Sequence, residues 1–147
     1  MIKLFPIYKL MYFWKIKVLI LNKKIGIIGG GQLGKMILDE TNKMGIPVSI
    51  LDPSIDSPCS NLSHNFIQGD FKDYDTILNF GLKHDIISYE IEHSNVDALD
   101  ELTRRGVKIL PSPKILRIIQ DKNKQKLFFN KNNFPTSNFT YFKSKNE

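Results

Sequence analysis

The chain has 147 residues and a formal net charge of +6. Its apolar fraction of 41% and charged fraction of 24% are those of a folded domain, which excludes disordered, collagen-like and low-complexity classes. A single cysteine, Cys59, excludes an internal disulfide and a cysteine metal site, so the sequence predicts an intracellular, cytoplasmic protein.

The excess of positive charge lies at the amino terminus, where residues 1–24 contain six lysines and no acidic residue. The rest of the chain is balanced, so it has no basic surface that predicts a nucleic-acid partner. Residues 1–23 are apolar and aromatic, but Lys9, Lys15 and Lys17 interrupt every window of the about 20 apolar residues that a membrane span needs. Two interpretations stay open: a non-native leader, or an amphipathic segment that lies on a membrane or binds a partner.

Strand-like and helix-like segments alternate along the remainder of the chain. In chain order, apolar runs, helical spacing and turn residues predict a strand at 24–29, a helix at 32–44, a strand at 47–52, a loop at 53–63, a short strand at 66–67, a helix at 73–82, a strand at 85–89, a helix that Ser94 caps and Gly106 ends, a strand at 107–110, a helix that Ser112 and Pro113 open, and a helix at 122–131. A further strand is expected to start within 136–142. Within 73–82, Tyr74, Ile77, Leu78 and Leu82 are expected to face inward.

This alternation predicts an α/β fold with a Rossmann-like, doubly wound parallel sheet, because parallel strands need helical crossovers. Ligands of such sheets bind outside the carboxyl ends of the strands. The residues expected there are Gly29–Gly34, Asp52, Glu90–His93 and Pro111–Pro113.

The first of these segments, GGGQLG, contains a G-x-G-x-x-G pattern between a strand and a helix. Its glycines allow positive φ and close approach of a ligand, and the free N–H groups of the helix start favour an anion such as phosphate. Asp52 ends the next strand, where an acidic residue of a dinucleotide enzyme would bind the ribose of NAD. The alternative for Asp52 is a loop-capping role before Pro53.

A third segment, YEIEH, follows the strand at 85–89 and places two carboxylates, Glu90 and Glu92, in alternation. In an extended stretch they share one side, where they would suit an amine, a hydroxyl or a metal. The alternative is a solvated acidic loop. His93 and Cys59 are interpreted as incidental side chains.

The ordered set KIGIIGGGQLGKM, GIPVSILDPSIDSPCS, GDF, YEIEH, GVKILPSP and IIQDKNKQK resembles one family. It is similar to the N-terminal, pre-ATP-grasp domain of 5-(carboxyamino)imidazole ribonucleotide synthase, the PurK type of ATP-grasp ligase. Formate-dependent glycinamide ribonucleotide transformylase has a similar domain, but its glycine loop usually carries Glu where this chain has Gln32.

The resemblance implies an ATP- and Mg²⁺-dependent carbon–nitrogen ligase of purine biosynthesis that carboxylates 5-aminoimidazole ribonucleotide with bicarbonate. It implies substrate contacts by Gly31, Gln32, Leu33, Glu90 and Glu92. It also implies an ATP contact by Lys122 of the QDK segment, where relatives often have arginine, and it allows a homodimer.

The resemblance further implies a division into residues 1–23 as an atypical leader, 24–120 as the pre-ATP-grasp domain, and 121–147 as an incomplete start of the ATP-grasp region. The ATP-grasp part would supply the catalytic residues and magnesium ligands, so neither is expected within this chain. We therefore expect the 147-residue product to be inactive alone. The alternatives are the NAD-binding domain of an oxidoreductase, a transformylase-like fragment, and a non-catalytic module directed by the basic leader.

Overall fold

The computed structural model of the protein describes residues 22–63 and 65–140. In these ranges five strands form one parallel sheet in the order β3-β2-β1-β4-β5, which confirms the predicted doubly wound α/β fold. The strands are β1 (Ile25–Ile28), β2 (Val48–Asp52), β3 (Asn65–Gln68), β4 (Ile86–Tyr89) and β5 (Lys108–Leu110). Because β1 is central, the loop that follows it lies between the ends of β2 and β4.

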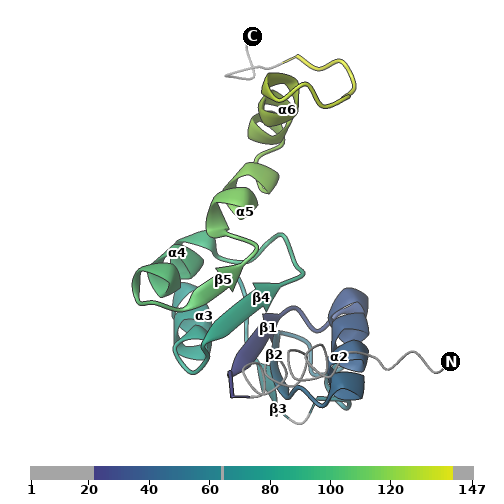
Figure 1. The fold of residues 1–147 in the computed structure, drawn as a ribbon, viewed down its shortest axis with the longest axis vertical. Coiled ribbons are helices and arrows are strands. Elements are labelled where there is room, and N and C mark those ends of the chain that lie inside the picture. Colours follow the sequence, from purple (N-terminus) through teal and green to yellow (C-terminus); the bar gives the residue numbers. More distant parts are fainter. Residues whose placement is uncertain (1–21, 64, 141–147) are drawn as a thin grey trace, which may run out of the picture.

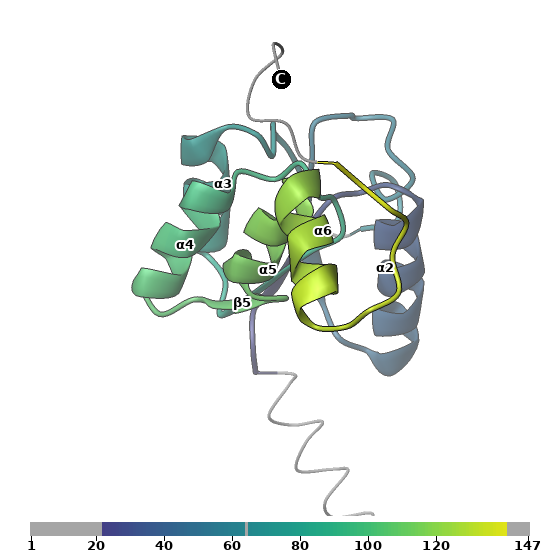
Figure 2. The ribbon, with the colours of Figure 1, turned by 90° about the horizontal axis from the view of Figure 1, so that it is seen from above.

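Helices cover both faces of the sheet (Figures 1 and 2). The helices are α2 (Gln32–Met44), α3 (Tyr74–Gly81), α4 (Val96–Arg104), α5 (Pro113–Ile119) and α6 (Lys122–Lys131). Helix α2 covers one face, and α3 and α4 cover the other (Figure 2). Helices α5 and α6 extend away from the sheet beyond the end of β5 (Figure 1).

The alternation of side chains along the central strands divides the core in two. Ile27 and Ile50 pack with Leu38 of α2 in one cluster. Their neighbours Ile28 and Leu51 pack in the other cluster, with the buried residues of α3 and α4. Successive side chains of a strand point to opposite faces, so a fully apolar strand contributes to both layers.

Two details of the predicted helices are wrong. Asn95, not Ser94, caps α4: its side chain accepts a hydrogen bond from the Ala98 N–H, whereas the buried Ser94 hydroxyl donates to the Ile91 carbonyl. In α3, Tyr74 and Leu82 are exposed, and Phe80 is buried together with Ile77. Ile77 and Phe80 lie three positions apart and therefore share the face toward the sheet.

An apolar stripe of α2 faces outward. Leu33, Met36, Ile37 and Met44 are exposed, while Gly34 and Leu38 make the buried face. Exposed apolar side chains also occur from the end of β5 onward. They are Leu110 in β5, Ile115 in α5, Leu127 and Phe128 in α6, and Phe134 after α6.

Some sequence expectations lie outside the described residues. The leader is described only from Asn22, and of the strand expected within 136–142 the structure describes residues 136–140, which form no strand. Within the described ranges, no helix combines the length and the apolar character that crossing a membrane requires.

Candidate functional site

The glycine loop leaves β1 and enters α2 at the carboxyl edge of the sheet. Gly29 has a φ of 106°, in the left-handed region that favours glycine, and its N–H donates to the Leu51 carbonyl at 2.9 Å. Gly31 is the N-cap of α2 and offers no side chain to the helix. The first intrahelical bond runs from the Lys35 N–H to the Gly31 carbonyl, so the N–H groups of Gln32 and Leu33 have no partner within the helix. These N–H groups and the helix dipole favour an anion or a carbonyl oxygen.

Asp52, at the end of β2, fixes this loop from one side. Its carboxylate accepts a hydrogen bond from the Gly30 N–H at 2.7 Å through Oδ2 and from the Ser54 N–H at 2.9 Å through Oδ1. The residue is only 8% exposed. Both oxygens therefore accept a backbone hydrogen bond, which is the loop-capping role, and little of the residue is exposed to the ribose hydroxyls of a dinucleotide.

Glu90, directly after β4, covers the loop from the other side. A Cβ atom placed on Gly29 would lie 2.6 Å from Glu90 Oε1, and one placed on Gly31 would lie 3.2 Å from the same oxygen. Partial burial raises the pKa of the Glu90 carboxyl, a hydrogen bond from the Gly31 backbone opposes this, and the charge of Asp52 raises it further. The site thus combines backbone donors with a carboxyl group whose proton affinity is increased.

Close packing behind the loop explains the third glycine and Cys59. A Cβ atom on Gly34 would collide with the Gly29 carbonyl oxygen. The buried Cys59 donates its N–H to the Gly30 carbonyl at 3.1 Å, and burial raises the pKa of its thiol. Cys59 therefore packs behind the glycine loop. Ser57 Oγ, next to Gly30, is buried without a hydrogen-bond partner among the described residues.

Glu92 and Lys122 lie near each other. The chain turns at Glu92, so the alternation of an extended strand, which would place it beside Glu90, does not continue. Its carboxylate instead lies 3.8 Å from the Lys122 ammonium, and both side chains are largely exposed. Lys122 is the first residue of α6, whose N-cap is Asp121.

Sequence reasoning missed Gln120. Its Nε2 donates to the carbonyls of Glu92 and Ser94, both at 2.8 Å, and so ties the loop after β4 to the end of α5. No local pattern marks such a contact, because the partners are backbone atoms 26 and 28 residues away. The structure therefore brings Gly31, the start of α2 and Glu90 together, and places Glu92 and Lys122 at a second position.

The described ranges contain no group of three or more His, Cys, Asp or Glu side chains that could hold a metal ion. The described part of the chain therefore offers no cluster of side chains that fits a magnesium ion. Lys122 is the one residue among the sequence candidates with a charge suited to a nucleotide phosphate.

A parallel sheet with helices on both faces and a glycine loop at its central strand defines a Rossmann-like domain. Residues 22–120 match the family described as the ribonucleotide synthetase pre-ATP-grasp domain, and the chain belongs to this family. Within it, the domain is that of the PurK type, the N5-carboxyaminoimidazole ribonucleotide synthases.

Individual relatives agree with this assignment. The chain is 40% identical over 102 residues to the N5-carboxyaminoimidazole ribonucleotide synthase of Staphylococcus haemolyticus, covering 69% of this chain and 27% of the relative. It is 39% identical over 103 residues to the chloroplastic phosphoribosylaminoimidazole carboxylase of Vigna aconitifolia, covering 70% of this chain and 18% of the relative.

Solved structures give the same result. The synthetase of Thermotoga maritima superposes with a TM-score of 0.76 at 44% identity, covering 83% of this chain and 34% of that chain. The Aspergillus clavatus synthase in complex with ADP and 5-aminoimidazole ribonucleotide superposes with a TM-score of 0.73 at 34% identity. The match covers 80% of this chain and 31% of that chain. The chain thus spans about a third or less of the length of these relatives.

Proposed function

We propose that this chain supplies the ribonucleotide-binding domain of an ATP-dependent carbon–nitrogen ligase of purine biosynthesis. The complete enzyme carboxylates the amine of 5-aminoimidazole ribonucleotide with bicarbonate and consumes ATP with Mg²⁺. The observation that carries the proposal is the placement of the Glu90 carboxylate over Gly29 and Gly31, beside the free N–H groups of α2.

In this proposal Gln32 and Leu33 present backbone N–H groups, and Gln32 also its side-chain amide, to the phosphoribosyl part of the substrate. Gly31, whose N–H faces the Glu90 carboxyl, lets the substrate approach the backbone closely. Glu90 accepts a hydrogen bond from the exocyclic amine or a sugar hydroxyl. A carboxylate over the loop would repel a phosphate placed at Gly31. We therefore place the phosphate nearer the N–H groups of Gln32 and Leu33.

The second position, formed by Glu92 and Lys122, lies at the start of α6. We propose that Lys122 contacts ATP and that Glu92 orients the Lys122 ammonium, from which it is separated by 3.8 Å. Their exposure leaves both side chains free to contact a ligand held mainly by another part of the enzyme.

Turnover needs more than this domain, because phosphoryl transfer depends on positioned metal ions and the described residues offer no such cluster. The exposed apolar side chains after β5 and on α6 are consistent with a larger neighbouring part, on the same or a second polypeptide. We therefore propose that residues 121–147 begin the ATP-grasp region and that the 147-residue product alone is inactive. A homodimer of the complete enzyme is compatible with this arrangement.

Isothermal titration of the full chain with 5-aminoimidazole ribonucleotide and with NAD tests the binding function. We expect the ribonucleotide to bind and NAD to give no heat, because Asp52 is engaged by the loop. Glu90→Gln removes a charged acceptor worth about 1.5–3 kcal/mol, so affinity should fall about tenfold or more.

The matched control is Glu40→Gln, on the exposed side of α2, where the carboxylate pairs with Lys43 alone among the residues that the structure describes. It should leave affinity unchanged. Binding of NAD without binding of the ribonucleotide would overturn the proposal. Phosphate release by the 147-residue chain alone, with ATP, Mg²⁺, bicarbonate and ribonucleotide, would overturn the expected inactivity.

A further inference from the structure

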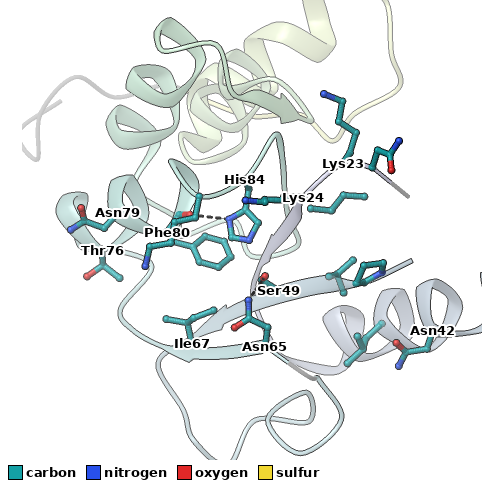
Figure 3. A pocket seen from close by; sticks show the side chains of 16 residues that line it. Lys23, Lys24, Asn42, Ser49, Asn65, Ile67, Thr76, Asn79, Phe80 and His84 are labelled. Carbon is teal, nitrogen blue, oxygen red and sulfur yellow. Dashed lines mark hydrogen bonds between the residues drawn. The ribbon is translucent and has the colours of Figure 1, made fainter. Parts of the chain in front are cut away.

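A cavity of about 830 Å³ lies at the amino edge of the sheet, at the opposite end of the strands from the glycine loop (Figure 3). Its volume is within the range of about 300–1,000 Å³ that is typical of sites for small molecules. Side chains of α2, β2, β3 and α3 line it, together with those of the segment that enters β1. The polar side chains in this lining indicate what the cavity can hold.

A polar pair interrupts the apolar sheet inside the cavity. Ser49 lies in β2 between Val48 and Ile50, which pack toward α2, so its own side chain points to the α3 face. Ser49 is only 8% exposed, and its hydroxyl oxygen accepts a hydrogen bond of 2.6 Å from the side-chain amide of Asn65 in β3. Among the described residues, the Ser49 hydroxyl proton and the Asn65 side-chain carbonyl have no partner. One donor and one acceptor therefore remain for a bound molecule.

Helix α3 adds two polar groups to the same cavity (Figure 3). Thr76 and Asn79 are three positions apart and therefore share a face of the helix. Only the backbone N–H of Thr76 is bonded, to Asp73, and neither of the two side chains makes a hydrogen bond within the described part of the chain. Hydroxyl and amide groups both donate and accept, which suits the hydroxyl groups of a sugar.

Apolar and aromatic side chains complete the wall around these polar groups. Ile67 of β3 lines the cavity, and the Phe80 ring lies so close to β1 that a Cβ atom on Gly26 would be 2.8 Å from it. The His84 ring packs on Phe80 with centroids 4.6 Å apart. Its Nδ1 is 2.9 Å from the Phe80 carbonyl and must donate to it, and burial lowers the pKa of His84, so the ring is neutral at pH 7. Nε2 is then a further acceptor for a hydroxyl group.

The rim of the cavity is positively charged. Lys24 and Lys83 line it and have no carboxylate partner among the residues that the structure describes, whereas Lys23 is paired with Asp85 at 3.1 Å. No acidic side chain belongs to the described lining. The carboxyl-terminal ends of α2 and α3 also lie at this edge, but each contributes only about half a negative charge. The two whole charges of the unpaired lysines therefore make the rim attractive to an anion.

We propose that this cavity binds a sugar phosphate, either free or as part of a mononucleotide. The phosphate lies at the rim near Lys24 and Lys83, and the sugar hydroxyls bond with the Ser49–Asn65 pair and Thr76. The site is separate from the proposed ribonucleotide site, because the glycine loop lies at the carboxyl edge of the sheet. Binding at either edge can fail without affecting the other.

Amide NMR spectra of the isotope-labelled full chain, titrated with ribose 5-phosphate and with AMP, test the proposal. We expect shifts of the backbone amides of Ser49 and Thr76 and of the side-chain amide of Asn65. A ligand at the glycine loop shifts Gln32 and Leu33 instead, so the two sites are observed separately in one spectrum. Adenosine lacks the phosphate and inorganic phosphate lacks the sugar, so both should bind several-fold more weakly at the cavity.

Three variants test the residues that carry the proposal. Lys24→Gln and Lys83→Gln alter exposed side chains and should each weaken binding about two- to fivefold. Lys131→Gln, the same change at an exposed position at the end of α6, is the matched control and should leave binding unchanged. Ser49→Ala removes a hydrogen-bonding hydroxyl and should weaken binding about two- to tenfold.

The relative affinities of AMP and ribose 5-phosphate identify the source of the ligand. Tighter binding of AMP would assign a mononucleotide, and tighter binding of ribose 5-phosphate would assign a free sugar phosphate. Absence of shifts at the cavity with both probes at millimolar concentration, or shifts confined to the glycine loop, would overturn the proposal. So would equal affinity for adenosine or for inorganic phosphate, or an affinity that all three cavity variants leave unchanged.

Discussion

Replacement of Asp52 by alanine removes both hydrogen-bond acceptors that hold the glycine loop to β2. The Gly30 N–H is buried and loses the Asp52 carboxylate, its hydrogen-bond partner among the described residues, which costs about 1–3 kcal/mol. The Ser54 N–H is nearer the surface, so water replaces part of its bond. We expect Asp52→Ala to lower the free energy of unfolding by about 3 kcal/mol, a large part of the about 5–15 kcal/mol that stabilises a typical domain.

Urea unfolding followed by circular dichroism measures this loss. With a slope of about 2 kcal/mol per molar urea, the midpoint should fall by about 1.5 M with the slope unchanged. Asp52→Asn keeps the volume and one acceptor oxygen, so its effect should be intermediate.

The control is Asp56→Ala. Asp56 is exposed in the loop that follows β2, and its carboxylate makes no hydrogen bond with the described residues. Surface changes of this kind stay within about 0.5 kcal/mol. If Asp52→Ala and Asp56→Ala agree within that margin, Asp52 does not fix the loop.

Three further substitutions test other contacts. The pKa of Glu90 is raised in the folded state, so its ionisation lowers the free energy of unfolding as pH rises above 4.5. In denaturant titrations the free energy of unfolding of Glu90→Gln should therefore increase relative to that of the native chain as pH rises. A difference that does not change with pH would contradict this. In thermal unfolding, Gly34→Ala should lower the free energy of unfolding by about 3 kcal/mol, because the new Cβ atom collides with the glycine loop. Gly45→Ala has no such obstruction and only the strain of a φ of 68°, so it should lower the free energy by about 1 kcal/mol. Equal losses would refute the close contact at Gly34. Gln120→Ala should speed proteolysis and amide exchange of the loop after β4, and Gln125→Ala should not; equal rates would show that the two carbonyl contacts do not hold it.

The regular elements could be predicted because their signals are local. The strand at Ile25–Ile28 is a short β-branched run, and the helix that follows it starts at Gln32 and ends before Gly45, as its composition indicates. The predicted N-cap of α4, Ser94, is wrong by one position, because Asn95 caps the helix. Ser94 and Asn95 are both good caps, and only the burial of Ser94 decides between them.

The site could be predicted in part. The glycine loop and Glu90 follow from their places at strand ends in a doubly wound sheet. The role of Asp52 stayed open between ribose binding and loop capping, because the two differ only in the direction of the carboxylate. Gln120 could not be found, since its partners are carbonyls of a loop distant in sequence.

The central position of β1 sets an order for assembly. The strand emerges first from the ribosome, yet its loop is complete only after β2 has brought Asp52 and β4 has brought Glu90 alongside, and Gln120 joins the structure later still. Pairings this distant in sequence form slowly, because each must first close a long stretch of chain. A nascent polypeptide that ends before about residue 120 thus contains the glycine loop with Asp52 and Glu90, but lacks the Gln120 contacts that tie the loop after β4 to the end of α5.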